Sequence, residues 1–314
     1  AHEAWFTDAR PPFDWGFAAE TSSVLLVAAA IAAALVWRVI GRRLPRPELP
    51  FLAPLGRLAP WVPRLLAIHA GVSLLAQAAT RSYLVPSLDL PRTPLGSALA
   101  IAEGALGVWL ISGFRIRAAA IAVVVAGPVG MFGYGVVPIL ERMDLLGIAL
   151  FLAVSPPGSD RWGAARTDPA EASTATLALR ALTGGSLILL AFTEKLARPD
   201  LALAFLDRYP AFNLLETLGL QVSDVDFIRI AGAMELLFGL LIISGTAPLL
   251  VVIAAGIPFN ATLFFLGSEE LIGHLPIYGA MLALLTYGSN RELAPMMDTF
   301  PARLTGRRIL AGTG

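Results

Sequence analysis

The chain has 314 residues, of which 56% are hydrophobic and only 15% are charged. A water-soluble domain carries about 25% charged residues, so this composition excludes an ordinary soluble domain and predicts an all-α polytopic membrane protein that lies in a lipid bilayer. The formal net charge is zero, which argues against nucleic acid as a partner. The sequence contains no cysteine, which excludes disulfides, thiolate metal sites and cysteine-ligated iron–sulfur clusters.

Residues 1–20 are polar and aromatic, and we expect them to form an arm at the membrane surface. Trp5 and the aromatic residues that follow it suit the belt at a membrane–water interface. The chain begins with Ala1 rather than methionine, which is typical of an end from which a signal peptide has been removed and which then faces the periplasm. His2 and Glu3 are candidate ligands for copper or zinc, because imidazole and carboxylate groups beside an amine suit either ion.

Nine apolar segments follow along the chain. The first, residues 23–40, has spanning length and ends in a cluster of arginines, which marks the cytoplasmic side. The other eight segments are expected at about 61–80, 95–114, 118–139, 145–154, 176–196, 224–244, 248–266 and 271–287. This order places the N-terminus in the periplasm and the C-terminus in the cytoplasm, with the chain in a bacterial inner membrane.

Composition also divides the chain into stretches of different character. The loop 197–222 has an amphipathic pattern that predicts a short helix lying on the membrane. Proline, glycine, serine and charge dominate the linker between the two halves. The expected stretches are a periplasmic aromatic arm (1–20), a first helix with a proline-rich cytoplasmic link (21–60), a first four-helix unit (61–155), a cytoplasmic linker (156–175), a second four-helix unit (176–289) and a cytoplasmic tail (290–314).

Two matched pairs of segments indicate an internal repeat. Residues 71–86 read GVSLLAQAATRSYLVP and residues 184–199 read GGSLILLAFTEKLARP, so their residue numbers differ by 184 − 71 = 113. A second match begins at Glu103 and Glu235, whose residue numbers differ by 235 − 103 = 132. We therefore expect one four-helix unit used twice in tandem. The difference between the two offsets, 132 − 113 = 19, is the length of an insertion expected only in the second copy.

Two of the candidate functional residues are carboxylates within predicted spans. An ionisable side chain inside a membrane is costly, so each is a functional hypothesis by default. Glu103 and Glu235 lie at equivalent repeat positions and are candidates for accepting a proton or contacting a quinol. The alternative is that each carboxyl pairs with a neighbour and locks the repeats together.

Further candidates gather at the outer side of the second unit. Glu194 and Lys195 end its first helix, either as a snorkelling pair at the interface or as part of a polar track with Arg180, in which Lys195 and Arg180 would contact a cofactor. His274 follows two glutamates and is either a proton carrier or part of a solvated loop end. We expect a pocket here, lined by Glu194, Glu235 and His274 and roofed by the loop 197–222.

The second unit resembles the DoxX/DoxD-like family of integral membrane proteins. The resemblance lies in Arg180 opening a glycine-rich span, in AFTEKLARP ending at Pro199, in Glu235 with Ser244-Gly245 after it, and in His274-Leu-Pro. It covers about residues 176–288 and, more weakly, 62–154. The resemblance implies four-helix units, of which some are associated with thiosulfate:quinone oxidoreduction and others are accessory to periplasmic redox systems.

Three functions remain open at the level of sequence. The first is a membrane subunit of a quinone-linked or periplasmic redox system, with a site for a proton or quinol at the outer side of the second unit. The second is a non-catalytic subunit that anchors a larger membrane complex, and the third is a small-solute transporter. Three histidines are too few for two bis-histidine haems, so electrons would come from a bound quinone or a partner subunit.

Overall fold

The computed structural model describes residues 3–158, 163–165 and 168–298, and most of them are helical. Within these residues, seven helices are long and apolar enough to cross a membrane. This is the architecture of a polytopic helical membrane protein, as the composition predicts. The small exception is a two-stranded antiparallel hairpin in the first half, where β1 pairs with β2.

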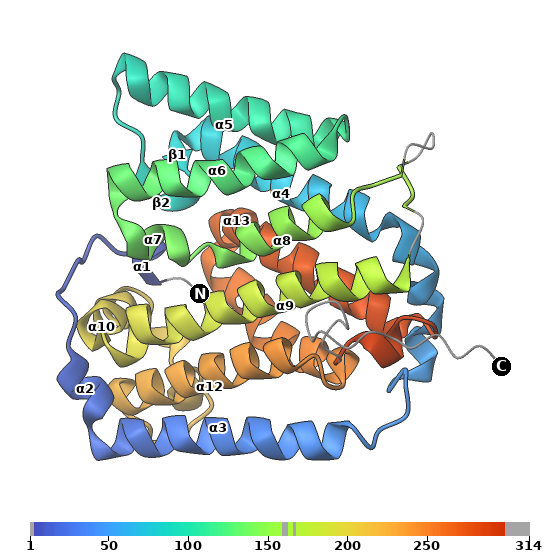
Figure 1. Ribbon diagram of the computed structural model, residues 1–314. Helices are drawn as coiled ribbons and strands as arrows, with labels where there is room; N and C mark the ends of the chain where they lie inside the picture. The colour runs from blue at the N-terminus through green and yellow to red at the C-terminus, as the bar shows by residue number, and fades with distance from the viewer. Residues whose placement is uncertain (1–2, 159–162, 166–167, 299–314) are drawn as a thin grey trace.

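The long helices lie side by side as a layered bundle (Figure 1). Their bounds are α3 (Thr21–Gly41), α4 (Val62–Thr80), α5 (Pro94–Ser112), α6 (Ile116–Tyr134), α8 (Met143–Val154), α9 (Pro169–Leu190), α12 (Asp224–Ser244) and α13 (Pro248–Ser289). The shorter elements are α1 (Glu3–Phe6), α2 (Trp15–Ala19), η1 (Pro50–Trp61), β1 (Ser82–Tyr83), β2 (Val85–Asp89), α7 (Val136–Leu140), η2 (Ala191–Leu196), α10 (Pro199–Arg208), η3 (Pro210–Phe212), α11 (Leu214–Thr217) and η4 (Ala294–Met296). We call the end of the bundle with α1, α2 and α10 the arm end, and the opposite end the far end.

The helix α13 is two helices joined at a sharp break. Gly267 has φ 67° and ψ −140°, which glycine adopts far more readily than other residues. A Cβ atom placed on Gly288 would lie 2.9 Å from Cγ of Pro248, so the two ends of α13 meet at the far end. The part of α13 after Gly267 therefore folds back along the part before it, so α13 corresponds to the last two predicted helices.

The predicted count of nine spans depends on α13 and on α8. Counting α13 as two helices adds one to the seven. The remaining helix, α8, has 12 residues and extends roughly 18 Å at 1.5 Å per residue, which is shorter than the roughly 30 Å hydrocarbon core. Nine spans stays a prediction.

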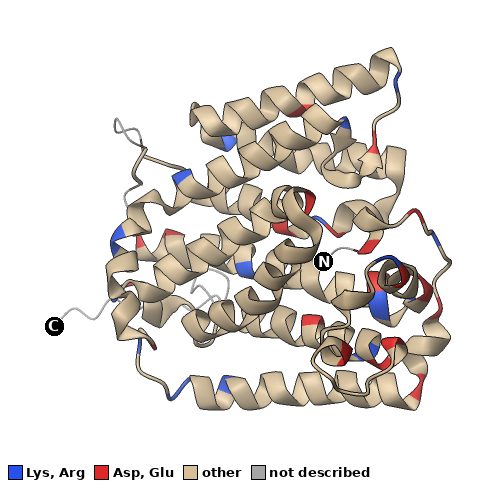
Figure 2. Ribbon diagram, turned by 180° about the vertical axis from the view of Figure 1, so that it is seen from behind, with Lys and Arg blue, Asp and Glu red and all other residues tan. Residues whose placement is uncertain are grey.

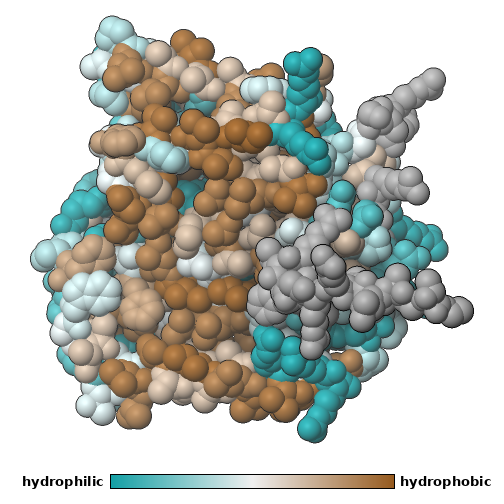
Figure 3. Space-filling view, in the orientation of Figure 1, coloured by the Kyte–Doolittle hydropathy of each residue, from teal (hydrophilic) through white to brown (hydrophobic). Residues whose placement is uncertain are grey.

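Apolar side chains cover the outside of the bundle. On α3, Leu25 is 64% and Leu35 62% exposed, although both are large and hydrophobic. Figure 3 shows hydrophobic residues spreading across the middle of one face, with hydrophilic residues towards the ends. In Figure 2, the acidic residues gather mainly at the arm end. A surface that is apolar in a central band suits a lipid environment.

Several segments differ from the sequence predictions. The stretch between the predicted spans 61–80 and 95–114 forms the β1–β2 hairpin, whose tight turn places Leu84 at φ 57°. The predicted helix 118–139 is divided at Gly135 (φ 89°) into α6 and α7, whereas Pro128 lies within the continuous α6. The proline-rich link forms η1, against which Asn290 Nδ2 donates a hydrogen bond to the Gly56 carbonyl.

The sequence predicts that residues 1–20 lie at the membrane surface, but part of this arm is buried in the protein. Glu3 is 4% and Phe6 5% exposed, because α1 is inserted between other elements. A side chain on Gly273 would collide with the Trp5 ring, so this part of α13 leaves room for the arm. Trp5 and Phe6 therefore pack inside the protein, whereas Phe13 is 36% and Trp15 61% exposed, so an interfacial position stays a prediction for these two.

Glycine contacts recur at the two predicted offsets. In the first half, a Cβ on Gly71 would lie 2.7 Å from the Gly107 carbonyl oxygen, and in the second half Gly184 meets the carbonyl of Gly239 in the same way. The residue numbers of these glycines differ by 184 − 71 = 113 and by 239 − 107 = 132. Small residues let helices approach closely in a membrane, so α4 crosses α5 as α9 crosses α12.

A reciprocal pair of contacts joins the two halves. Gly147 of α8 packs against Leu179 of α9, while Gly279 of α13 packs against Leu66 of α4. Their residue numbers again differ by 279 − 147 = 132 and by 179 − 66 = 113. The last helix of each half therefore packs on the first helix of the other half.

Candidate functional site

A π-helical turn brings Glu194 and Lys195 into the interior. The segment η2 continues α9, and its wider turn is closed by a hydrogen bond from the Ala197 N–H to the Phe192 carbonyl, five residues back, at 2.8 Å. Glu194 is 1% and Lys195 5% exposed. Consecutive residues are both buried here, and π-turns of this kind occur frequently at functional sites.

Lys195 bridges two carboxylates that come from distant parts of the chain. Its Nζ lies 2.7 Å from Glu3 Oε1 and 2.9 Å from Glu235 Oε1. The Glu3 backbone N–H donates a hydrogen bond of 2.8 Å to Glu194 Oε2. A buried ion pair is tolerated when further hydrogen bonds satisfy its atoms, so we treat Glu3, Glu194, Lys195 and Glu235 as one unit, the arm cluster.

Packing on α12 fixes the position of the lysine. A Cβ atom on Gly232 would lie 2.8 Å from Leu196 and 3.3 Å from Lys195, so α12 can approach η2 only because this position has no side chain. Glu235 lies three residues later, on the same face of α12. Gly232 thus lets α12 come close enough for Glu235 to contact Lys195.

Two carboxyls at the arm end have shifted pKa values in opposite directions. Burial by itself would raise the pKa of Glu3, but the Lys195 ammonium and the hydrogen bond with Glu194 outweigh it and lower the pKa. Burial raises the pKa of Glu141, which lies between α7 and α8. Glu3 is therefore held ionised, whereas the protein favours the neutral form of Glu141.

An apolar cavity of about 260 Å³ ends at the arm cluster, and we call it the Glu235 pocket. It lies between α12 and the first half of α13, with η3 and α11 over it. Glu3, Lys195 and Glu235 supply its charged wall. The rest of the lining is almost wholly apolar: Phe212, Leu214, Leu215, Phe227, Ile230, Ala231, Met234, Phe238, Pro258, Phe259, Ala261, Thr262 and Phe265. This combination of apolar walls and a few convergent polar groups is typical of small-molecule sites.

A line of polar contacts leads from the Glu235 pocket towards α8. The Thr262 hydroxyl donates to Glu270 Oε1 at 2.6 Å, and His274 Nδ1 lies 3.3 Å from Glu270 Oε2. The His274 ring packs on Trp5 with 5.0 Å between centroids. Arg142 donates to the Gly273 carbonyl at 2.8 Å, and its guanidinium lies 5.9 Å from the centroid of the Trp5 ring. His274 and Glu270 are buried, so they do not form a solvated loop end.

The predicted pocket and the observed one share some residues. Glu235 lines the cavity, and the segment 197–222 covers it through η3 and α11. Glu194 lies behind the wall and is joined to it through Glu3. His274 is connected to it through Glu270 and Thr262 rather than lining it.

The remaining candidates lie elsewhere. Arg180 is at the far end, where its guanidinium donates to the Ser244 carbonyl at 3.0 Å and to the Met297 carbonyl. It therefore caps the end of α12 and does not contact the Glu235 pocket. Glu103 lines a separate cavity in the first half, where its Oε1 accepts a hydrogen bond from the Leu84 N–H at 2.9 Å.

The metal prediction falls partly outside the described residues, because His2 is not among them. The Glu3 carboxylate forms an ion pair with Lys195. Within the part of the chain that the structure describes, no group of three or more histidine, aspartate or glutamate side chains could hold a metal ion. A copper site at the N-terminus stays a prediction.

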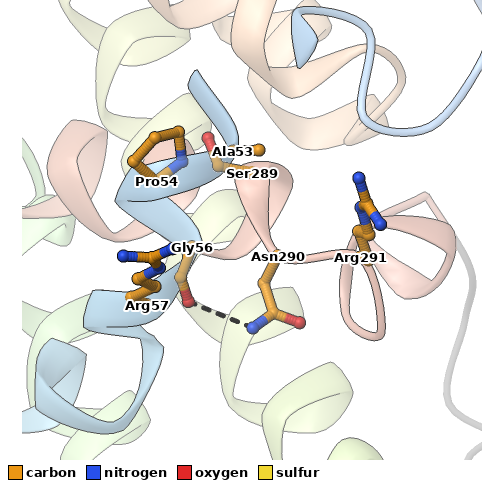
Figure 4. A pocket seen from close by; sticks show the side chains of 7 residues that line it. All are labelled: Ala53, Pro54, Gly56, Arg57, Ser289, Asn290 and Arg291. Atoms are coloured by element: carbon orange, nitrogen blue, oxygen red, sulfur yellow. Dashed lines mark hydrogen bonds between the residues drawn. The ribbon is translucent and has the colours of Figure 1, made fainter. Parts of the chain in front are cut away.

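A cavity of about 370 Å³ also opens at the far end (Figure 4). It lies where η1 meets the end of α13. Arg57 and Arg291 stand on different sides of it, and their guanidinium groups do not converge on one point. This arrangement lacks the focus of charge that an anion site needs.

Sequence reasoning missed Glu3 as the partner of Lys195 and Thr262 as a link to Glu270. Glu3 is 192 residues from Lys195, and no periodic pattern connects them. The available signal for Glu3 was a carboxylate in an aromatic arm, and that signal was interpreted as a metal ligand. Thr262 and Glu270 meet only because α13 breaks at Gly267.

Comparisons with known proteins found no match: no family model, no curated protein and no solved structure corresponds to this chain. The structure therefore defines a class, a polytopic helical membrane protein with an ion-paired cluster at the end of an apolar pocket. The resemblance to the DoxX/DoxD-like family stays a prediction.

Proposed function

We propose that this chain is a quinol-binding inner-membrane protein of a periplasmic redox system, with its head-group site in the Glu235 pocket. The observation that carries the proposal is an apolar cavity between membrane helices that ends on Lys195 and Glu235. A quinone ring has apolar faces and polar oxygens at its edges. The aromatic walls suit the faces, the ammonium can donate to a quinone carbonyl, and the carboxylate can accept from a quinol hydroxyl.

The cavity volume and the exposure of its rim support a ligand that arrives from the bilayer. About 260 Å³ is slightly below the range of complete ligand pockets, so it suits a ring while an isoprenoid tail stays in lipid. Met234 is 43% and Phe265 38% exposed, and both lie at the rim between α12 and α13. A tail would leave the protein between these two side chains.

Charge compensation in the arm cluster suits proton transfer. Lys195 contacts two carboxylates, so Glu235 can gain or lose a proton while Glu3 remains paired with the ammonium. General acid–base steps need such a group within hydrogen-bond reach of the ligand. We assign Glu235 as the proton acceptor, Lys195 as the oxygen ligand and Glu3 as the residue that positions Lys195.

The proposal includes the tandem DoxX-like repeat, which the two cavities support. The Glu235 pocket and the Glu103 cavity share matched lining positions, related by the same offset as the two glutamates: Ala231 and Leu99, Met234 and Ala102, Glu235 and Glu103, Phe238 and Leu106, Pro258 and Ala126, and Ala261 and Val129. The glycine contacts at the same offsets agree with this pairing. We infer two four-helix units, each with a cavity behind its second helix, and orient the arm end towards the periplasm.

The test is quinone binding by the full chain. Protein purified from native membranes in mild detergent is extracted for quinone and titrated with decylubiquinone. We expect bound quinone in the extract and about tenfold weaker binding in Ala231→Leu, which narrows the pocket with the residue found at the matched position of the first unit. Glu269→Gln, a change at an exposed position outside the pocket, is the control and should bind quinone as the wild type does. Absence of saturable binding in the wild type would overturn the proposal.

A further inference from the structure

The second cavity, in the first half, has its own chemistry. It holds about 360 Å³ between α5, α6 and the β1–β2 hairpin. We call it the Glu103 cavity. Its rim faces outward, since Ala105 and Val125 are exposed residues of the lining. The described residues that line it include one ionisable carboxyl, Glu103, and no lysine or arginine.

One oxygen of this carboxyl has no partner. Glu103 is 4% exposed, and its Oε1 accepts the Leu84 N–H. Its Oε2 is buried and has no hydrogen-bond partner among the described residues. An unsatisfied buried oxygen costs about 1–3 kcal/mol, so a ligand that supplies a hydrogen bond here would be stabilised by that interaction.

The other polar groups of the lining are already occupied. The Tyr83 hydroxyl donates to the Ala126 carbonyl at 2.7 Å, and burial together with Glu103 raises the pKa of Tyr83 to about 12, so it keeps its proton. Trp109 Nε1 donates to the Phe114 carbonyl at 2.6 Å. Neither is available to a quinone carbonyl. The cavity therefore lacks the donor that Lys195 provides in the Glu235 pocket.

We infer that the Glu103 cavity binds a lipid alcohol, an apolar chain with a hydroxyl at one end, which enters from the bilayer between α5 and α6. The hydroxyl both donates and accepts, so it can pair with Oε2 whether the carboxyl is ionised or protonated. The chain lies along the apolar lining. The site is separate from the quinol site and has no part in electron transfer.

The experiment uses the full chain in phosphatidylcholine vesicles with a photoreactive probe, a dodecanol that carries a diazirine in its chain. After illumination, labelled peptides are mapped by mass spectrometry. We expect labelling within residues 94–134 that unlabelled dodecanol suppresses at least fivefold. The corresponding dodecane probe, which carries the diazirine but no hydroxyl, should label this segment at least fivefold less, because it can neither donate nor accept a hydrogen bond.

Two matched variants separate the cavity from general partitioning into lipid. Ala105→Phe places bulk in the cavity and should reduce the labelling at least fivefold, while Ala29→Phe makes the same change on the lipid-facing surface of α3 and should leave it unchanged. Equal labelling by the alcohol and the alkane probe, or labelling spread equally over α3 and the rest of the surface, would overturn the inference. Neither outcome depends on quinone binding at Glu235.

Discussion

Glu103 and Glu235, which the proposed repeat places at matching positions, each line an apolar cavity, but their partners differ. Glu103 receives a backbone N–H from the β1–β2 hairpin. Glu235 contacts the ammonium of Lys195, which also binds Glu3 of the arm. The glycine contacts between helices recur at matching offsets in the two halves, whereas the connecting segments differ. In this protein the connecting segments, rather than the helices, therefore supply the groups that distinguish the two sites.

The largest expected effect comes from removing the cation. Lys195→Met leaves the buried Glu3 carboxylate and the partly buried Glu235 carboxylate without a counter-charge, and breaking a buried pair in this way costs about 3–5 kcal/mol. The matched position in the first half is Ser82 (195 − 113), whose hydroxyl donates to the Pro86 carbonyl. Ser82→Ala should cost about 1 kcal/mol. The free energy of unfolding in detergent, measured for both variants, checks this. Equal losses of stability would contradict the difference between the two halves.

Substitution of the two glutamates should affect quinol binding to different extents. Glu235→Gln removes the proton acceptor, and we expect about tenfold weaker quinol binding, or about 1.4 kcal/mol. Glu103→Gln keeps an oxygen for the Leu84 N–H and should change quinol binding less than twofold. Titration of both variants with decylubiquinol checks this. If Glu103→Gln abolished quinol binding while Glu235→Gln left it unchanged, the quinol site would lie in the first half and the proposal would be wrong.

A pH series should reveal the contribution of Glu3. Its pKa is lowered in the folded protein, so its stabilisation is complete above the ordinary carboxyl pKa and is lost as the pH falls through the lower folded value. Glu3→Gln should therefore lower the melting temperature most at pH 7, with a difference that shrinks as the pH decreases below about 4.5. A difference that grows on acidification would contradict the ion pair.

The smallest expected effect has the opposite sign and concerns Glu141. Burial raises its pKa, so the ionised form is penalised in the folded state and the penalty disappears as the pH falls from the folded value to the ordinary one. Glu141→Gln, which resembles the neutral form, should raise the melting temperature slightly at pH 7 and leave it unchanged at acidic pH. A loss of stability at pH 7 would mean that Glu141 is held ionised.

The helices were predictable from the sequence because apolar runs of spanning length need no information about partners. α12 has the bounds expected for it, and α3 lies within two residues of its expected segment at each end. Outer connections were predicted less well. The hairpin after α4 depends on Leu84 adopting a positive φ, and nothing in SYLVPSLD requires that of a leucine.

The candidate site was predictable only in part, for the same reason. Glu235 and Lys195 could be selected as ionisable groups in or near spans. Their pairing depends on the π-turn at η2 and on Gly232, and the third member, Glu3, comes from an arm that the sequence placed on the membrane surface. These features arise from packing between segments that are far apart in the chain, which a single sequence does not specify.

The most direct test of the central claim, that the two matched cavities differ in what they bind, is to locate a quinone on the chain. Protein in vesicles is illuminated with an azido-ubiquinone, and the crosslinked peptides are mapped by mass spectrometry. We expect crosslinks in residues 210–266, around the Glu235 pocket, that excess decylubiquinone suppresses at least tenfold. Crosslinks concentrated in residues 94–134, around the Glu103 cavity, would contradict it.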